Sequence, residues 1–394
     1  MTYDYVIVGL GKTGISCAKH LAKINATFAV TDSREQPPGL DEFKTLCPNV
    51  PISLGQFDEA LMLSAHELVV SQGVSYQEPA ILACHKQGIV MIGDIELFAR
   101  AAKAPVIAIT GSNAKSTVTT LVGEMAKAAG KNVRVGGNLG TPALDLLSDT
   151  EPDLYVLEIS NFQLETTYSL KAAVACVLNI TPDHLDRYAK FEDYIAAKQR
   201  VYIGCQKAVV NRDDKLTWLP HTNHANVVSF GESQPQANEF GLLTTDHTYL
   251  AFGNRTLLDV NALKIKGKHN WMNALAAIAI GYQAGLTAEP MLTVLQSFTG
   301  LPHRCEWVRE LNGITWYNDS KGTNIGATVA AMSGLGSAIK GKIVLLAGGL
   351  GKGADFRELK PATLQYARIV ILYGKDAQLI ANGLGGEISI LFVE

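Results

Sequence analysis

The chain has 394 residues, of which 47% are hydrophobic and 18% are charged, and its formal net charge is -3. This composition is typical of a globular protein with two or three domains and excludes a disordered chain. The small net charge argues against binding to nucleic acid or to a membrane surface, so a phosphorylated ligand would be held by local Gly, Lys and Arg groups.

Apolar strand-like runs alternate with helical runs along nearly the whole chain, which predicts an α/β protein with parallel sheets. The first domain begins with the predicted strand YVIVG (5–9), a Gly-rich turn and a helix through Leu21. Three further strands are predicted at AVTD (29–32), ELVVSQG (67–73) and GIVMIGD (88–94). We expect this domain to end near Gly93.

The second domain follows a predicted helix, IELFARAAKA, and the helix breaker Pro105. Its strands are predicted at VIAITG (106–111), DLYVLEIS (153–160), VACVLNIT (174–181) and KAVVNRDD (207–214). The turn-rich residues 216–262 predict a small β excursion, and HNWMNALAAIAIGYQAGL (269–286) predicts a long buried helix that closes the domain.

The third domain begins with a predicted hairpin, in which Asn312-Gly313 joins EWVREL to ITWYND. Asn-Gly is typical of a type I′ turn because both central residues take positive φ. Continuous apolar strands are predicted at KIVLLAGG (342–349), ARIVILYG (367–374) and ISILFVE (388–394). We therefore expect three domains, at residues 1–93, 94–298 and 299–394.

The first motif is Gly9-Leu10-Gly11-Lys12-Thr13-Gly14, which directly follows a strand and opens a helix. Glycines in this pattern let the backbone approach a pyrophosphate, and Asp32 at the end of the next strand suits a ribose hydroxyl. On this motif alone, a site for NAD or FAD, a site for another nucleotide and a purely structural turn all stay open.

The second motif is TGSNAKST (110–117), between the strand VIAIT and a predicted helix. It departs from the standard GxxxxGK[ST] loop, because Ile109 and Ala114 stand where that loop has glycine. Its place is still that of a phosphate loop, with Lys115 to reach the β/γ oxygens and Ser116 or Thr117 to bind Mg²⁺. A lysine on the first turn opposes the helix dipole, which favours a functional role over a structural one.

Further candidates follow later strands and helices. Glu158 and His184 each follow an apolar strand, where α/β proteins bind ligands, although a solvated strand end and a helix N-cap within residues 183–186 are the plain alternatives. Lys198 lies in an apolar helix, where a lysine is usually a surface side chain that snorkels. The third domain carries three polar loops, at residues 301–304, 318–324 and 348–352.

The six cysteines are scattered and form no CxxC pair, which indicates reduced thiols rather than a zinc knuckle or a disulfide scaffold. The opening residues, MTYDYVIVGLGKTG, predict a strand and a turn rather than a signal peptide, and no charge-free run is long enough to span a bilayer. We therefore expect a cytoplasmic protein that makes no use of a membrane.

Together these residues resemble the Mur ligase family along the whole chain. The loop TGSNAKST is similar to the family form TGTNGKST, and the other motifs follow in family order: EISNFQLE, NITPDHLDRY, AAKQR, KGKHNWMNALAA, GLPHRCEWV, NDSKGTN and LLAGGLGKGADF. The resemblance implies a three-domain α/β fold, with a Rossmann-like N-terminal domain, a central P-loop ATPase domain and a C-terminal Rossmann-like domain that is incomplete here.

The resemblance also implies an activity in peptidoglycan precursor synthesis. A monomer would use ATP and two Mg²⁺ ions to ligate D-glutamate to UDP-N-acetylmuramoyl-L-alanine through an acyl phosphate, with release of ADP. The N-terminal domain would then bind the UDP part of the substrate rather than NAD. No protein nucleophile is required, because two anionic oxygens must meet and cations do most of the catalysis.

The position of each residue in these motifs assigns its implied role. The implied catalytic residues are Lys115, His184 and Lys198, the last as a carbamate. The implied metal ligands are Ser116, Glu158, His184 and Lys198. ATP binding falls on Gly111, Ser112, Asn113, Ala114, Lys115, Ser116, Thr117, Asn270, Arg304 and Asp319. UDP-substrate binding falls on Gly11, Lys12, Thr13, Asp32, Ser33, Arg34, Gly73, Asn138 and Gln163, and D-glutamate binding falls on His303, Lys321, Thr323 and Lys352.

Two departures from the family pattern carry expectations of their own. Ala114 replaces a glycine, which costs little if its φ is negative and is strained if its φ is positive. The family continues for several dozen residues past the position of Glu394, and that segment includes part of the D-glutamate pocket. We therefore expect poor ligation by this chain and exposed apolar surface beside its last strand.

Three alternative functions stay open on the sequence. A folylpolyglutamate synthase-like ligase shares the fold but lacks an N-terminal UDP domain, so residues 1–93 speak against it. An NAD-dependent oxidoreductase built on Gly9, Gly11 and Gly14 leaves TGSNAKST and NDSKGTN unexplained. The third alternative is a non-catalytic nucleotide-binding fragment.

Overall fold

The computed structural model describes residues 2–218, 226–265, 267–337 and 339–393. The chain divides into two compact units. Unit 1 consists of Met1–Thr110, Lys131–Ala175 and Ala196–Lys207, and unit 2 consists of Gly111–Gly130, Cys176–Ile195 and Ala208–Glu394. In the described part of the chain, no helix is both long enough and apolar enough to cross a membrane.

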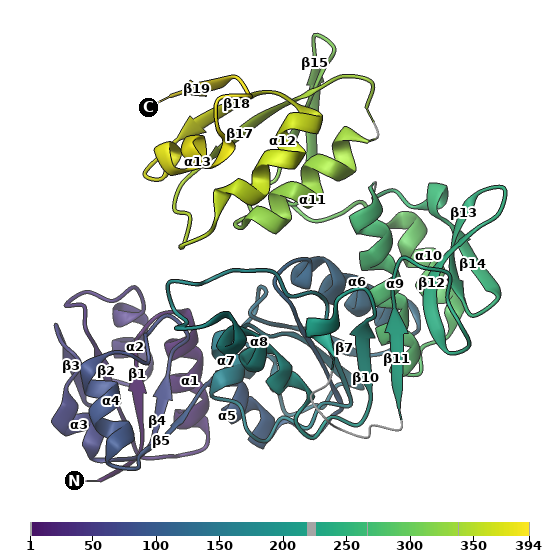
Figure 1. The fold of residues 1–394 in the computed structure, drawn as a ribbon. Coiled ribbons are helices and arrows are strands. Elements are labelled where there is room, and N and C mark those ends of the chain that lie inside the picture. The colour runs from purple at the N-terminus through teal and green to yellow at the C-terminus, as the bar shows by residue number, and fades with distance from the viewer. Residues whose placement is uncertain (1, 219–225, 266, 338, 394) are drawn as a thin grey trace. The chain divides into compact units, whose positions relative to one another are not determined.

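Unit 1 begins with a parallel sheet whose strand order is β3-β2-β1-β4-β5 (Figure 1). Its strands are β1 (Tyr3–Val8), β2 (Phe28–Asp32), β3 (Ile52–Leu54), β4 (Ala65–Val70) and β5 (Val90–Ile92). The connecting helices are α1 (Lys12–Lys23), α2 (Leu40–Leu46), α3 (Glu59–Leu63) and α4 (Pro79–Lys86), and α5 (Asp94–Ala101) follows the last strand. Apolar side chains of α3 and α4 pack on Val6, Val8 and Leu68, so the continuous apolar strands are those of a sheet covered by helices.

The rest of unit 1 contains a second set of parallel strands, in which β8 pairs with both β6 and β7. These strands are β6 (Val106–Thr110), β7 (Val133–Gly137) and β8 (Leu154–Glu158), accompanied by η1 (Ala143–Leu146), α7 (Asn161–Glu165) and η2 (Arg200–Tyr202). The strand β9 (Val174–Val177) and the helix α8 (Phe191–Gln199) each run from one unit into the other along the chain. Polar residues follow the carboxyl ends of β6 and β8, which is where α/β proteins bind their ligands.

Unit 2 confirms the predicted β excursion within the described residues. The strands β10 (Ala208–Asn211), β11 (Val227–Phe230) and β12 (Glu239–Thr244) pair in parallel, and β13 (Thr248–Phe252) and β14 (Arg255–Asp259) extend them in an antiparallel manner. Its helices here are α6 (Lys115–Ala128), η3 (Lys215–Thr217), η4 (Val260–Ala262), α9 (Lys268–Gln283) and α10 (Ala288–Ser297). The predicted long helix is α9, and residues 274–281 along it are buried. Residues 219–225 of the predicted excursion lie outside the described ranges.

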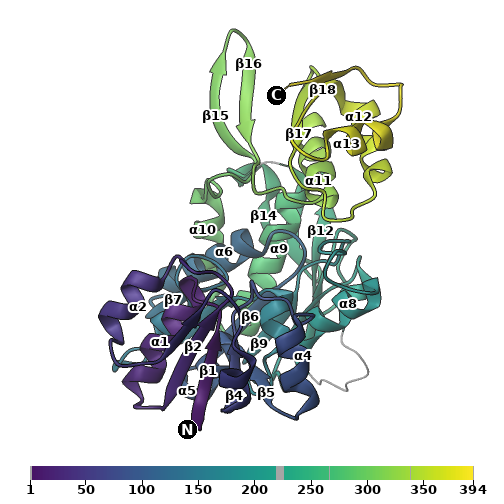
Figure 2. The same ribbon diagram turned by 90° about the vertical axis from the view of Figure 1, so that its left-hand side faces the viewer.

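The last part of unit 2 opens with the predicted hairpin, which Figure 2 shows as a two-stranded ribbon. It consists of β15 (Glu306–Leu311) and β16 (Ile314–Asn318), and φ is 52° at Asn312 and 75° at Gly313, as a type I′ turn requires. A parallel sheet of β17 (Ile343–Gly348), β18 (Ala367–Tyr373) and β19 (Ile390–Phe392) follows, with α11 (Ile325–Gly336), η5 (Phe356–Leu359), α12 (Lys360–Tyr366) and α13 (Ala377–Leu384).

Apolar surface is exposed at the last strand, as the sequence predicted. Leu391 and Phe392 are about half exposed, and so are Val344 and Leu346 on β17. The buried faces of the same sheet, with Val370 and Leu372 of β18, pack against α11, α12 and α13. Glu394, the last residue of the predicted strand, lies outside the described residues.

Candidate active site

The predicted phosphate loop lies between β6 and α6, at the point where the strand ends and the helix begins. Lys115 is the first residue of α6, and its Nζ donates hydrogen bonds to the carbonyl oxygens of Gly111 at 2.9 Å and Ser112 at 3.0 Å. The first turn of α6 contains no acidic side chain, so its positive dipole end is available to an anion. The lysine side chain is thus folded over the loop.

Ala114 has the left-handed conformation that a glycine would adopt without strain. Its φ is 64° and its ψ is 0°, and it is the N-cap residue of α6. The sequence left the sign of this φ open, and the structure shows the positive, strained value. A left-handed conformation at a residue with a Cβ costs roughly 1–2 kcal/mol.

We expect Ala114→Gly to stabilise the protein by roughly 0.5–1 kcal/mol. Glycine removes the left-handed strain, but its more flexible unfolded chain offsets part of that gain. The free energy of unfolding from denaturant titration measures the difference. Ala129→Gly, at the C-cap of the same helix with a φ of -80°, is the control that should not stabilise. A destabilised Ala114→Gly variant would contradict the strain.

A cavity of about 750 Å³ adjoins the loop within unit 2. Six of the predicted ATP-binding residues line it, namely Asn113, Ala114, Thr117, Asn270, Arg304 and Asp319. The cavity also includes apolar residues of α11, such as Ala327 and Ala331, and its size is typical of a site for a nucleotide-sized ligand. The remaining predicted ATP-binding residues, Gly111, Ser112, Lys115 and Ser116, belong to the loop itself.

Two predicted ATP contacts flank the hairpin, with Arg304 just before β15 and Asp319 just after β16. Arg304 Nη2 donates a 2.9 Å hydrogen bond to Ser116 Oγ, so the arginine reaches the first turn of α6. Asp319 Oδ1 accepts the N–H of Cys305 at 2.9 Å. Burial raises the pKa of Asp319, against the lowering effects of that N–H and of Arg304.

A polar network joins the loop to the residues that follow β9 and to the third predicted domain. Asn324 caps α11 through its Oδ1, and its Nδ2 donates to Asn113 Oδ1 at 2.9 Å and to Asp183 Oδ2 at 3.3 Å. Lys352 Nζ lies 3.7 Å from Asp183 Oδ1. Neither Asp183 nor Asn324 is among the predicted site residues, although they lie in the motifs NITPDHLDRY and NDSKGTN.

The predicted D-glutamate residues are only partly brought together. His303 and Lys321 are neighbours, because the Lys321 N–H donates to the His303 carbonyl at 3.1 Å, and the Thr323 N–H donates in turn to the Lys321 carbonyl at 3.0 Å. His303 Nδ1 lies 2.7 Å from Asn318 Nδ2. Lys352 pairs with Asp183 instead.

The predicted metal ligands are divided between the two units, with Glu158 and Lys198 in unit 1 and Ser116 and His184 in unit 2. Glu158 is only 3% exposed and Lys198 only 1%, so neither is the solvated or snorkelling residue of the plain alternative. No helix begins at His184, and the next one starts at Phe191, so the N-cap alternative is also wrong. In the described ranges, no group of three or more His, Cys, Asp and Glu side chains could by itself hold a metal ion.

Glu158 has one satisfied and one unsatisfied carboxylate oxygen. Asn138 Nδ2 donates to Oε1 at 2.6 Å, whereas Oε2 is buried without a hydrogen-bond partner among the described residues. The backbone here is closely packed, because a Cβ on Gly137 would lie 2.4 Å from the Glu158 carbonyl oxygen. A buried oxygen of this kind is costly unless a cation or a donor completes it, so Glu158 fits a metal ligand.

The predicted UDP site lies in unit 1 around the first glycine-rich turn. Gly9 has a φ of 96°, a Cβ on Gly14 would lie 2.2 Å from the Gly9 carbonyl oxygen, and the Cβ position of Gly11 is open. Gly9 and Gly14 therefore shape the turn, while Gly11 leaves room for a ligand. Of the other predicted residues on this side, Lys12 Nζ donates to the Gly140 carbonyl, Thr13 is half-buried, and Ser33 and Gly73 are exposed.

Asp32 is buried, and its carboxylate bonds to the protein. It accepts the N–H groups of Leu10 and Arg34 and both Nε and Nη2 of the Arg34 guanidinium, at 2.7–2.9 Å. Burial opposes its ionisation, but these donors outweigh burial and hold the pKa of Asp32 below its usual value. The carboxylate therefore fixes the turn and the half-exposed Arg34 side chain in place.

Gln163, which is 2% exposed, lies in α7, which follows β8 along the chain. Its Nε2 donates to both oxygens of Asp94, and its Oε1 accepts the Ser160 N–H at 3.0 Å. Burial raises the pKa of Asp94 to about 6, against the lowering effect of the Gln163 amide. Ser160 Oγ also donates to Gln72 Oε1 at 3.1 Å, which joins this network to the loop of Gly73.

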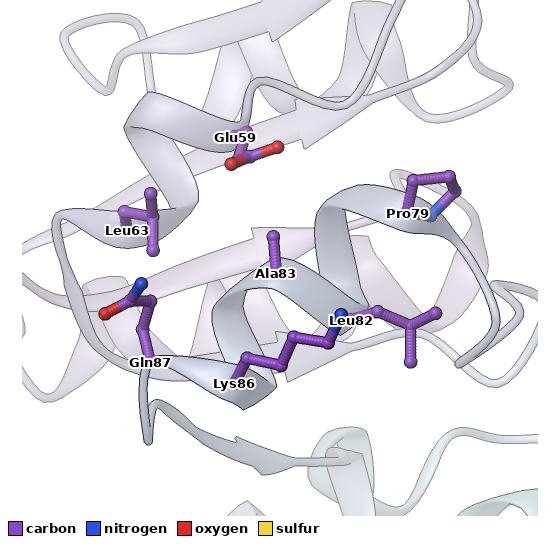
Figure 3. A pocket seen from close by; sticks show the side chains of 7 residues that line it. All are labelled: Glu59, Leu63, Pro79, Leu82, Ala83, Lys86 and Gln87. Atoms are coloured by element: carbon purple, nitrogen blue, oxygen red, sulfur yellow. The ribbon is translucent and has the colours of Figure 1, made fainter.

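A second, smaller hollow of about 390 Å³ lies between α3 and α4 in unit 1 (Figure 3). Its lining residues are Glu59, Leu63, Pro79, Leu82, Ala83, Lys86 and Gln87. None of them belongs to the predicted site, so this surface contributes nothing to the candidate active site.

Three family models match the chain and together span most of it. They are the Mur ligase MurD-like N-terminal domain at residues 3–93, the Mur ligase middle domain at 109–281 and the Mur ligase glutamate ligase domain at 303–393. With the phosphate loop, the nucleotide-sized cavity and the buried carboxylate, they define the class of protein: the chain belongs to the Mur ligase family.

Curated relatives narrow the similarity further. UDP-N-acetylmuramoylalanine–D-glutamate ligase of Legionella pneumophila (strain Lens) is 49% identical over 98% of this chain and 88% of its own length. The ligase of the same name from Pseudomonas aeruginosa (strain PAO1) is 52% identical over 98% of this chain and 87% of its own. The chain is similar to these proteins over nearly its full length.

Solved structures support the fold. A pseudomurein peptide ligase type C from Methanothermus fervidus superposes with a TM-score of 0.62 at 19% identity, covering 99% of this chain and 88% of its own. UDP-N-acetylmuramate-alanine ligase from Thermotoga maritima gives a TM-score of 0.65 at 18% identity, covering 99% of this chain and 90% of its own. The three-domain α/β fold of Mur ligases is therefore confirmed.

Proposed function

We propose that the chain ligates D-glutamate to UDP-N-acetylmuramoyl-L-alanine in an ATP-dependent, ADP-forming reaction of peptidoglycan precursor synthesis. The observation that carries this proposal is the identity of about half of all residues to ligases of that name over 98% of the chain. The phosphate loop and the cavity beside it supply the nucleotide site that such a reaction needs.

The chemistry follows from the groups in each unit. The precursor carboxylate attacks the γ-phosphorus of ATP, ADP leaves, and the amine of D-glutamate then displaces phosphate from the acyl phosphate. Lys115 holds the phosphate oxygens that gain charge, and Arg304, which reaches Ser116, adds a second cation beside them. Lys321 and Lys352 are the candidate partners of the D-glutamate carboxylates.

Glu158 would hold Mg²⁺ through its unpartnered Oε2, with Ser116 and His184 as further candidate ligands. Bound Mg²⁺ supplies positive charge that neutralises the oxygens of ATP and of the attacking carboxylate. The supporting observation is that Glu158 Oε2 is buried without a hydrogen-bond partner among the described residues, whereas an exposed carboxylate is satisfied by water.

Three further parts of the proposal concern organisation. We propose domains at residues 1–93, 94–298 and 299–394, a monomer in solution, and a cytoplasmic location, where ATP and UDP-linked precursors are made. Size-exclusion chromatography with light scattering tests the monomer.

Lys198 is proposed to be carbamylated and to bind a second Mg²⁺. An ammonium group would repel the cation, whereas a carbamate adds two oxygen ligands at the same place. With carbon-13-labelled bicarbonate, we expect a carbamate resonance in the wild-type protein that Lys198→Arg lacks. The absence of this resonance from the wild type loaded with nucleotide and Mg²⁺ would contradict the modification.

The first glycine-rich motif makes a separate prediction. We expect UDP to raise the melting temperature and NADH to leave it unchanged, because the N-terminal domain model matched is that of a Mur ligase. A ligand present at about 100 times its Kd stabilises by about 2.7 kcal/mol. Gly11→Val, which fills the open side of the turn, is expected to abolish the UDP shift. A shift with NADH would favour the oxidoreductase alternative.

The whole proposal is tested by phosphate release from ATP. We expect release only when UDP-N-acetylmuramoyl-L-alanine and D-glutamate are both present, together with Mg²⁺. Parallel reactions with L-glutamate and with other amino acids test the specificity. Release that does not depend on the UDP precursor, or that is faster with another amino acid, would show the proposed substrates to be wrong.

A further inference from the structure

On one side, the backbone of Ser112 and Asn113 in the phosphate loop is bound by Asn179, which lies two residues beyond β9. The Asn179 carbonyl accepts the N–H of Ser112 at 2.9 Å. Its side-chain Oδ1 accepts the N–H of Asn113 at 2.8 Å, and its Nδ2 donates to the Asn113 carbonyl at 3.2 Å. The side-chain amide thus satisfies both backbone groups of Asn113, as a neighbouring strand would.

The other side of Ala114 is fixed by the helix. The Ala114 carbonyl accepts the N–H of Val118 at 3.0 Å as the first bond of α6, and Lys115 Nζ is tied to the Gly111 and Ser112 carbonyls. Ala114 lies between these two fixed segments with its φ of 64°. Left-handed backbone is disfavoured at alanine by a factor of roughly 5–30, so the neighbours must enforce it.

We propose that Asn179 is a positioning residue of the active site, which holds Ala114 in the left-handed conformation and thereby places Lys115 for the phosphates of ATP. The step to ATP rests on the proposed function. A glycine in place of Ala114 would adopt the same conformation without being forced, so the need for Asn179 follows from the alanine in this chain.

Thr181 offers a matched comparison on the same stretch of chain. Its Oγ1 accepts a 3.2 Å hydrogen bond from Nδ2 of Asn113 and so contacts only the side chain of that residue. Like Asn179, it lines the cavity beside the loop. Thr181→Val therefore removes a contact to Asn113 without releasing its backbone.

The test is a double-mutant cycle with four proteins: the wild type, Asn179→Ala, Ala114→Gly and the two substitutions combined. Folding equilibrium constants come from denaturant titration, and ATP dissociation constants come from fluorescence titration with a labelled ATP in the presence of Mg²⁺. We expect Asn179→Ala to lower the folding constant and to weaken ATP binding in the Ala114 background. The loss of ATP binding should be about 5–30 times smaller when Ala114 is replaced by glycine, because a free alanine must be returned to the left-handed conformation and a glycine need not be. The loss in the folding constant should instead be larger with glycine, by up to the same factor, because release of Ala114 relieves its strain and offsets part of the lost hydrogen bonding.

Thr181→Val should lower the folding constant and the affinity for ATP by the same factors whether residue 114 is alanine or glycine. Equal losses for Asn179→Ala in the two backgrounds, or no loss at all, would overturn the proposal. If Asn179→Ala does not fold, Asn179→Asp replaces it, because aspartate keeps the acceptor for the Asn113 N–H and lacks the donor to its carbonyl, and the same dependence on residue 114 is expected. A wild type that binds no ATP would refute the proposed function, and the folding cycle would still decide whether Asn179 holds Ala114.

Discussion

Replacing Lys115 by alanine is expected to abolish ATP-dependent ligation and to leave UDP binding intact. Lys115 Nζ lies within hydrogen-bond distance of two carbonyl oxygens of the phosphate loop. The proposed reaction uses no protein nucleophile and relies on cations such as this one. Loss of one fixed cation at a site of developing negative charge costs about 3–4 kcal/mol, or roughly 10²–10³ in rate. Phosphate release under saturating substrates and the UDP melting shift measure the two effects separately.

UDP binding should survive because its predicted residues, such as Gly11 and Asp32, lie in unit 1, whereas Lys115 lies in unit 2. Lys127→Ala is the matched control. Lys127 lies on the same helix, α6, with its Nζ 2.8 Å from Glu124, and its side chain is exposed. It should keep nearly full activity. Turnover by Lys115→Ala within a few-fold of the wild type would remove the phosphate loop from the mechanism.

The sequence predicted most strands because they are continuous apolar runs. Strands such as β1 and β6 are covered by helices, so their apolar character is local and readable. Two strands were not predicted: β3, which has three residues, and β7, VRVGG, whose two glycines and arginine hide the strand. Both are recognised by their pairing with apolar neighbours, β2 and β8.

The site was predictable where one short motif carries the chemistry, as in the phosphate loop. It was not predictable where distant segments decide. The sign of φ at Ala114 depends on the amide of Asn179, which bonds to the preceding residue, Asn113, from 66 positions away in the sequence. The burial of Lys198 follows from the packing of α8 against distant segments, which the sequence of the helix alone does not reveal. Likewise, the contact of Asn324 with Asn113 joins residues 211 positions apart.

Glu158→Gln is expected to lower activity by about 10²–10³ without destabilising the protein. Glutamine preserves the shape of the side chain and can still accept the hydrogen bond from Asn138. It lacks the negative charge that would hold Mg²⁺, so the metal's share of charge neutralisation is lost. In the absence of metal, the buried Oε2 without a partner costs the wild type about 1–3 kcal/mol, and a neutral amide reduces that cost.

The two effects together distinguish a metal ligand from a structural carboxylate. Loss of a structural carboxylate lowers both the activity and the melting temperature, whereas loss of a metal ligand lowers activity and leaves the metal-free melting temperature equal or higher. Melting curves with and without Mg²⁺ and ATP supply the second readout, because the wild type should gain stability from the metal and Glu158→Gln should not. Glu151→Gln, at an exposed residue that precedes the same strand, is the control and should behave like the wild type. A Glu158→Gln protein that is less stable without Mg²⁺ yet still gains stability from the metal would show that Glu158 supports the fold rather than binding the ion.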